Sequence, residues 1–196
     1  YNANISVTGN TGGGTVLVGG DWQGSNGVYQ ATAVTMKRGA VIDASALING
    51  DGGKVVLWSD IKNHDSLTEA HGTIYAKGGA ISGRGGNVET SAGTLKTDNI
   101  FVDTRAADGS AGNWLLDPYN YVIGTNGAAD IVSALGTSNV LISTSSATSI
   151  RLDSIGNCST CGDFVLNGAI TYTGSNARTL TFQSHGYMNI SASITS

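Results

Sequence analysis

The sequence predicts an all-β fold built as a solenoid, because a short strand unit recurs along the chain in a fixed order. The first recurring unit is a strand preceded by a glycine pair, found at 13–18, 52–57, 85–90 and, with Ala for the first Gly, at 111–116. Aligned, the copies give two apolar columns: Val16, Val55, Val88 and Trp114, then Val18, Leu57, Thr90 and Leu116. Alternate residues of a strand share a face, so these columns predict one buried face.

A second recurring unit accompanies the first. It occurs at 41–44, 73–76 and 101–104, and in each copy an apolar residue is followed two positions later by a small one. A polar column, formed by Thr15, Lys54, Asn87 and Asn113, precedes the first apolar column of the glycine-led strands. The glycine pair fits a corner that needs either positive φ or close approach of two backbones. A two-strand module therefore repeats at least three times, as in a solenoid.

The composition favours a β-rich protein with a neutral polar surface. Charged residues are 12% of the 196 residues, about half of the ~25% usual for soluble chains, and hydrophobic residues are 40%, enough for a sizeable core. The net charge is −4, and Lys37–Arg38 is the only adjacent cationic pair, so nucleic acid is not an expected partner. No apolar run approaches the ~18 residues that a membrane-spanning helix needs, so we expect no membrane span.

The first part of the chain, residues 1–124, is predicted to consist of repeated strands. Strands are expected at 4–8, 15–18, 28–36 and 40–44, with a loop at 21–27. The polar arc Asp60–His71 is predicted to be an exposed excursion, and residues 72–104 repeat the module. Pro118, the only proline, would end strand pairing after the fourth glycine-led strand.

The second part, residues 125–196, is predicted to contain one short helix and further strands. Residues 128–136, centred on 130–135, are the helix candidate, because Ile131 and Leu135 lie on one face and Gly136 suits a C-cap. Strands are expected at 139–143, 163–170, 179–184 and 188–194. Both ends of the chain show strand alternation without a cap, so we expect one continuous solenoid that is a segment of a longer chain.

Four sequence signatures, in this order, resemble the large exoproteins of two-partner secretion in Gram-negative bacteria, which include the filamentous haemagglutinins and high-molecular-weight adhesins. The signatures are Gly-Gly-Thr-Val-Leu-Val-Gly-Gly-Asp-Trp-Gln-Gly at 13–24, Gly-Asp-Gly-Gly with Val-Val-Leu-Trp at 50–58, Gly-Gly-Asn-Val-Glu-Thr-Ser at 85–91, and Trp-Leu-Leu-Asp-Pro-Tyr at 114–119. The resemblance is strongest over residues 12–124. The Asn-Pro-Asn motifs of that family's secretion domain are absent, so the chain resembles a rod segment downstream of it.

This resemblance implies a right-handed parallel β-helix, secretion to the bacterial cell surface or beyond, and a part in attachment or biofilm. It also implies an outer-membrane transporter as partner during export, acting through a domain outside this chain. We therefore expect a non-enzymatic structural or adhesive segment that contacts a host or matrix glycan or protein receptor. The alternatives are a filament subunit that self-associates end to end and a β-helical polysaccharide-degrading enzyme.

Four aromatic residues are candidates for contact with a glycan or partner: Trp22, Trp58, Tyr75 and Tyr119. Trp58 follows Leu57 of the buried column, so strand alternation predicts that it points outward. Exposed aromatic rings suit sugar stacking or partner contact. The alternative is that a neighbouring loop covers them.

Acidic and histidine residues do not make a convincing catalytic or metal site. His64, Asp65, Glu69 and His71 share the polar arc, but the two histidines are seven apart and no HExxH-type spacing occurs. Pairs such as Asp51 with Asp60, or Asp98 with Asp103, could line a groove, although acidic residues are common at turns for conformational reasons. We expect a solvated loop face, no catalytic residue, no metal and no cofactor.

Cys158 and Cys161 are predicted to form a local disulfide if the protein is secreted. They form a single CxxC in a polar stretch without a nearby histidine, so a four-ligand zinc site is not supported. After alkylation, the intact mass of the reduced protein should exceed that of the unreduced protein by the mass of two alkylated thiols. Two thiols alkylated without reductant would rule the bridge out.

Overall fold

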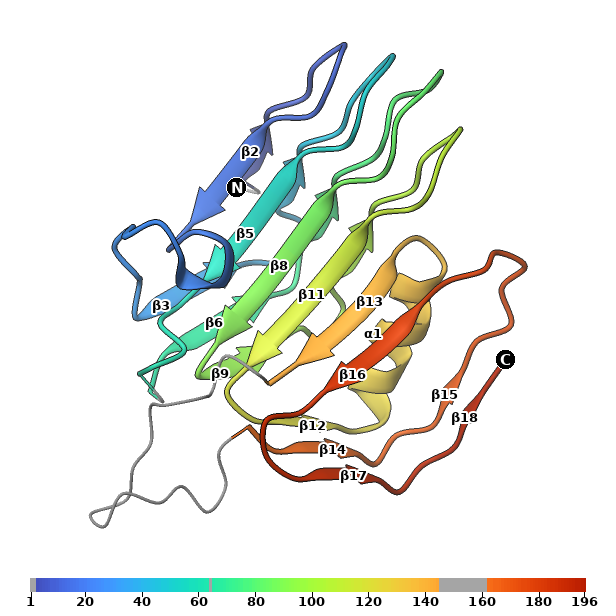
Figure 1. Cartoon of the computed structure of the whole chain (residues 1–196). Helices are drawn as coiled ribbons and strands as arrows, with labels where there is room; N and C mark the ends of the chain where they lie inside the picture. The colour runs from blue at the N-terminus through green and yellow to red at the C-terminus, as the bar shows by residue number, and fades with distance from the viewer. Residues whose placement is uncertain (1–2, 64, 145–161) are drawn as a thin grey trace.

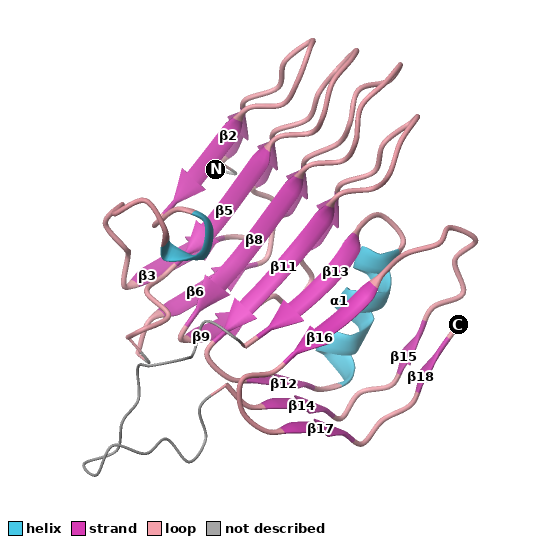
Figure 2. Ribbon diagram, in the orientation of Figure 1, coloured by secondary structure: helices cyan, strands magenta, loops and turns pink. Residues whose placement is uncertain are grey.

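The described part of the chain forms a mostly β structure with one α-helix, and all of its sheets are parallel (Figures 1 and 2). The computed structural model describes residues 3–63, 65–144 and 162–196. Within these residues, no helix is long and apolar enough to cross a membrane.

The residues that the structure describes form five parallel sheets. The largest contains β2 (Thr15–Val18), β5 (Lys54–Trp58), β8 (Asn87–Ala92), β11 (Asn113–Pro118), β13 (Asn139–Ser143) and β16 (Leu180–Gln183). A four-stranded sheet contains β1 (Asn4–Ser6), β4 (Val41–Asp43), β7 (Thr73–Tyr75) and β10 (Phe101–Asp103). A three-stranded sheet contains β3 (Ala33–Met36), β6 (Leu67–Ala70) and β9 (Thr94–Lys96). A second three-stranded sheet contains β12 (Tyr121–Ile123), β14 (Phe164–Leu166) and β17 (Met188–Ile190). A two-stranded sheet contains β15 (Ile170–Thr171) and β18 (Ile194–Thr195).

The chain visits these sheets in a repeating order. From β1 to β9 it passes three times through the four-stranded, the six-stranded and the three-stranded sheet in turn. Each strand pairs with its counterpart in the next pass, so equivalent residues of successive repeats lie side by side. The helix α1 (Thr125–Leu135) follows β12 and packs against both β10 and β15. It therefore stands between the four-stranded sheet and the β15–β18 pair.

The strand register predicted from the sequence is confirmed. Val16 pairs with Val55, Val55 with Val88 and Val88 with Trp114, and the column two positions later is likewise aligned. The register extends through β13 to β16. The apolar residues of both columns belong to the main core, except for Val18, which is partly buried and packs against it. The Thr90 hydroxyl accepts a 3.1 Å hydrogen bond from the Trp114 indole N–H.

The glycine pairs are required by close backbone approach, which is one of the two reasons expected. A Cβ atom built on Gly85 would collide with the carbonyl oxygen of Thr104, and one on Gly52 with that of Ala76. Neither glycine has a positive φ. Ala111 takes the equivalent position in the fourth copy. Here β10 is the last strand of the four-stranded sheet, and α1 rather than a further strand packs against it. This change of neighbouring element explains why the methyl group of Ala111 can be accommodated.

The expected exposed excursion at 60–71 is wrong in its second half. Residues 67–70 form β6, in which Thr68 and Ala70 are fully buried. The Thr68 hydroxyl donates a 2.9 Å hydrogen bond to the Ser91 carbonyl and lies 2.9 Å from the Ser59 hydroxyl. A buried hydroxyl that bonds a neighbouring repeat can occupy an inward position, so polarity alone misassigned this strand.

Several element boundaries also differ from those predicted. The helix begins at Thr125, earlier than the expected 128, and Gly136 is its C-cap in right-handed rather than left-handed geometry, with φ −65°. The strand expected at 28–36 starts only at Ala33, and the strands expected at 163–170 and 188–194 are each broken in two by a corner. Residues at such corners continue the apolar pattern, and this hides the break in the sequence.

Val88→Asp should destabilise the protein far more than Asn87→Asp. Val88 is fully buried, and an aspartate there would place an unpaired carboxylate in the core, at a cost of ~3 kcal/mol or more. Asn87 is exposed and accepts a hydrogen bond from the Asn113 side chain, which aspartate can also accept, so its effect should stay within ~0.5 kcal/mol. Urea unfolding measures both. Similar midpoints would show that the strand faces are assigned incorrectly.

Candidate functional site: a lateral groove beside Tyr75

A groove of about 470 Å³ runs across three successive repeats at the ends of β4, β7 and β10. Its lining combines small residues with a few polar ones: Asp43, Ser45, Ala46, Leu47, Lys77, Gly78, Ala80, Arg105, Ala106 and Ala107. The repeat order explains this lining. Each strand is followed by a buried residue, Ala44, Ala76 or Thr104. The next residue is still buried in the first repeat, where it is Ser45, but it reaches solvent as Lys77 and Arg105 in the other two.

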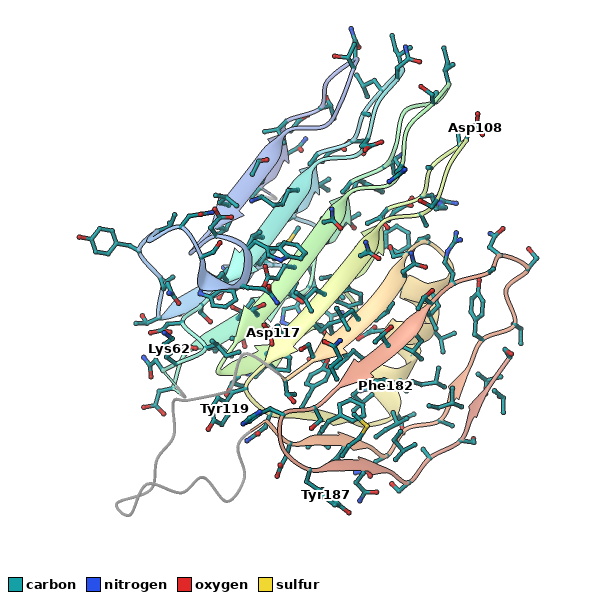
Figure 3. All side chains as sticks on the ribbon, viewed as in Figure 1. Lys62, Asp108, Asp117, Tyr119, Phe182 and Tyr187 are labelled. Carbon is teal, nitrogen blue, oxygen red and sulfur yellow. The ribbon has the colours of Figure 1, made fainter. Side chains whose placement is uncertain are left out.

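The loops that leave this groove stack side by side. They connect β1 to β2, β4 to β5, β7 to β8 and β10 to β11, and they project together from one edge of the structure (Figure 1). Backbone hydrogen bonds join them, for example from Gly50 N to Ser82 O at 2.9 Å and from Gly79 N to Gly50 O at 3.0 Å. Asp108 lies at the tip of the last of these loops (Figure 3). The groove therefore has one wall formed from hydrogen-bonded backbone.

One end of the groove is fixed by an ion pair. The carboxylate of Asp103, which is 1% exposed, accepts hydrogen bonds from Arg105 Nε at 3.0 Å and Nη2 at 2.7 Å, and from the Arg105 backbone N–H at 3.0 Å. These bonds raise the pKa of the Arg105 guanidinium further. Arg105 therefore stays charged and is held in one orientation at the rim.

The middle repeat contributes an aromatic ring and a second cation. Tyr75 packs edge-on against Phe101, with 6.3 Å between ring centroids and 71° between the planes. The ammonium of Lys77 lies 5.1 Å from the Tyr75 ring centroid, close enough for a cation–π interaction. Among the residues that the structure describes, no carboxylate lies within salt-bridge distance of Lys77. The Lys77 ammonium is thus available for a carboxylate or hydroxyl from outside the chain.

The groove offers donors and an acceptor in a row, and the partly exposed Tyr75 ring lies beside its lining residue Lys77. Register explains this arrangement. Asp43, Tyr75 and Asp103 occupy equivalent positions of β4, β7 and β10. Side chains therefore repeat at the ~4.8 Å spacing of neighbouring strands. Such an arrangement can hydrogen-bond the hydroxyl and carboxylate groups of an extended polymer and stack against one sugar face.

Trp58 and Tyr119 are both buried in the structure, and for Trp58 the covering-loop alternative is correct. Trp58 is 1% exposed and Tyr119 is 2% exposed, and they form a second apolar cluster with Val56 and Ile61 on the outer face of the six-stranded sheet. The predicted outward direction of Trp58 holds, because this cluster is separate from the main core. Its indole N–H donates a 2.8 Å hydrogen bond to Gln30 of the segment that covers it. Trp22 packs against the cluster and is partly buried.

The polar arc has structural contacts rather than a shared site. Glu69 forms a 3.0 Å ion pair with Lys96, whose hydrogen bond lowers the pKa of that carboxyl. His71 Nδ1 lies 2.9 Å from the Asp98 carbonyl oxygen. The described residues contain no group of three His, Cys, Asp or Glu that could hold a metal ion. His64, Cys158 and Cys161 lie outside the described residues.

The acidic turn residues are occupied by local hydrogen bonds. Asp51 accepts one from the Arg84 N–H at 2.7 Å, and Asp60 accepts one from the Lys62 N–H at 2.9 Å. Both contacts agree with the conformational explanation of acidic residues at turns.

Two residues of the groove, Lys77 and Arg105, were not predicted from the sequence. They share the column after the small residue of the second recurring unit, where Ser45 is their counterpart. Extending the aligned columns by one position would have placed both cations beside Tyr75. Comparison of the chain with protein-family models and with curated proteins gives no match. Assignment of function therefore depends on this geometry and on the sequence.

Asp103→Asn should destabilise the protein by ~1 kcal/mol, because it removes the charge that holds Arg105 while leaving the half-exposed guanidinium free to reach water. Asp43→Asn is the matched control, since Asp43 occupies the same position two repeats earlier and only accepts the Ser45 N–H. It should change the stability by less than ~0.5 kcal/mol. Chemical denaturation of the two variants tests this, and equal losses would contradict the role given to the ion pair.

Proposed function

We propose that the chain is a segment of a right-handed parallel β-helix and serves as a non-enzymatic, adhesive part of a large secreted bacterial surface protein. Its support is the fixed order in which the strands pass through the sheets and the resemblance of residues 12–124 to two-partner secretion exoproteins. Export of the whole protein would use an outer-membrane transporter, bound through a domain outside this chain.

A rod of this kind follows from the pairing of repeats. Each strand satisfies its backbone groups through the repeat before and the repeat after, and its inward side chains stack into one continuous apolar core. The result is stiffness along the stacking direction without a large globular domain. In a surface protein, that stiffness would hold a contact site away from the cell.

The groove beside Tyr75 is the proposed contact, and the single observation that carries it is the row formed by Lys77 and Arg105 next to the Tyr75 ring. Two cationic side chains one repeat apart suit a polymer with repeated carboxylates. The aromatic ring suits the apolar face of a sugar. We therefore propose an acidic polysaccharide of a host surface or biofilm matrix as the ligand.

A second candidate function, end-to-end self-association, is favoured by apolar cavities at both outer strands. A cavity of about 300 Å³ opens beside β1 and β3 and is lined by Ile5, Val18, Val34 and Met36 among others. Another of about 180 Å³ opens beside β18 and is lined by Ile170, Leu180 and Ile194 among others. Sedimentation velocity over a range of concentrations tests this candidate, and a concentration-independent monomer would exclude it.

The contact proposal is tested by binding of the chain to alginate, a polyuronate, with neutral dextran as the comparison. Lys77→Ala and Tyr75→Ala should each weaken alginate binding about tenfold, equal to ~1.4 kcal/mol, by removing a charge-assisted contact or a stacking surface. Tyr29→Ala is the control, because Tyr29 is 98% exposed and lies outside the groove. Equal binding to alginate and dextran would refute the groove as the contact. The same conclusion would follow if Tyr29→Ala lost as much alginate affinity as Lys77→Ala and Tyr75→Ala.

A further inference from the structure

The chain contains four asparagines that are each followed by a glycine: Asn26–Gly27, Asn49–Gly50, Asn126–Gly127 and Asn167–Gly168. Such pairs are chemically labile, because glycine has no side chain to hinder the approach of its backbone nitrogen to the preceding asparagine Cγ. Attack by this nitrogen expels the side-chain amide as ammonia. The four pairs share this local chemistry, so any difference between them in the folded chain comes from their surroundings.

Three of the four pairs are held in place by the fold. The Gly50 N–H donates a 2.9 Å hydrogen bond to the Ser82 carbonyl, and the Gly168 N–H donates one of 3.0 Å to the Ile123 carbonyl. Asn126 lies in the first turn of α1, where the helical backbone would have to unwind before a ring could close. A bonded or helical nitrogen reacts only after a local opening, so folding should protect these three pairs.

Asn26–Gly27 lies in the loop of residues 21–30, which contains the short 3₁₀ helix η1 (Trp22–Gly24) and joins β2 to β3 (Figure 1). Asn26 and Gly27 are both exposed and have left-handed φ values of 58° and 62°, as in the type I′ turns that Asn-Gly favours. Among the described residues, the Gly27 N–H has no hydrogen-bond partner, and the space beside its Cα is open. Its nitrogen is therefore free to react in the folded chain.

The Asn26 side chain has a defined task in this loop. Its Nδ2 donates a 2.7 Å hydrogen bond to one carboxylate oxygen of Asp21, which is 7% exposed. The other oxygen of Asp21 accepts bonds from Lys54 Nζ at 2.8 Å and from the Trp22 N–H at 2.7 Å. Asn26 and Asp21 belong to the same loop, so their bond orients the carboxamide without occupying the Gly27 nitrogen. An aspartate at position 26 would place a second negative charge where a donor now stands.

We propose that Asn26 is a self-modification site, which the folded chain converts to aspartate and isoaspartate through a cyclic imide formed with Gly27. A bond forms between the Gly27 nitrogen and Asn26 Cγ, the Cγ–Nδ2 bond breaks, and ammonia leaves with the proton that the Gly27 nitrogen loses. Water then opens the imide at either carbonyl, giving its hydroxyl to the new carboxylate and a proton to the nitrogen. One water is consumed for each ammonia released, and nothing is oxidised or reduced. The proposal is independent of the groove beside Tyr75.

Modification should loosen the loop on the outer face of the six-stranded sheet. The new carboxylate repels Asp21, whose ionic partner is Lys54, and isoaspartate also lengthens the backbone at the turn. Trp22 would then pack less firmly on the outer apolar cluster. The bond from the Trp58 indole N–H to Gln30 does not involve the turn, so the loop should loosen rather than detach.

The rate of deamidation in the whole chain tests the site. The chain is kept at mildly alkaline pH, either folded or unfolded in urea, and is then digested with trypsin. The four pairs fall in separate tryptic peptides, 1–37, 39–54, 106–151 and 152–178, so each is followed by its mass gain and located by fragmentation. Folding should slow the other three pairs by at least ~10-fold, because they wait for a local opening, and should leave Asn26 within ~2-fold of its unfolded rate. Equal protection of all four pairs would overturn the proposal.

Two variants complete the test. Asn26→Gln keeps a carboxamide donor but would have to close a larger, six-membered ring, so the early deamidated form of peptide 1–37 should disappear. Its persistence would place the reaction at another asparagine and refute the assignment. Asn26→Asp reproduces the charge of the product. Compared with Asn26→Gln, it should unfold at lower urea concentration and shift tryptophan emission toward that of hydrated indole. Identical midpoints and emission in the two variants would contradict the loosening of the loop.

Discussion

Every strand of the six-stranded sheet hydrogen-bonds to its counterpart one repeat away, and the register of these pairings does not change from β2 to β16. This constant register is the constraint on which the other features depend. It keeps apolar columns inside and places equivalent polar residues, such as Asn87 and Asn113, in contact outside. It also brings backbones so close at Gly52 and Gly85 that side chains cannot be accommodated there.

The same constraint generates both surface features of functional interest. A groove that spans three repeats arises because equivalent positions after β4, β7 and β10 line up, with Lys77 and Arg105 in one row. On the outer face, the sheet turns Glu89 outward between Val56 and Leu115, and residues 21–30 cover it through the Gln23 N–H. Stacked strands thus supply a regular frame, and the irregular segments between them give each face its chemistry.

Much of the fold could be predicted because the relevant interactions are periodic. The columns through Val55 and Leu57, the second strand unit and the helix around Ile131 are present in the structure where the pattern places them. Strand β6 of the three-stranded sheet was missed because Thr68 fills an inward position with a hydroxyl that bonds the next repeat. Of the candidate site, Tyr75 was predicted, whereas its neighbours Lys77 and Arg105 required the three repeats to be placed side by side.

The sequence by itself determined the period, the register and the inward or outward direction of residues in the glycine-led strands, because a strand alternates its faces and a repeat copies its neighbour. Only the tertiary structure decided which outward residues meet solvent. Trp58 and Glu89 both point outward, yet both are buried, because residues 21–30 lie over them. The Gln23–Glu89 contact joins residues 66 positions apart, and this distance follows no period of the chain. Its formation depends on where an aperiodic loop packs, and local pattern does not encode that position.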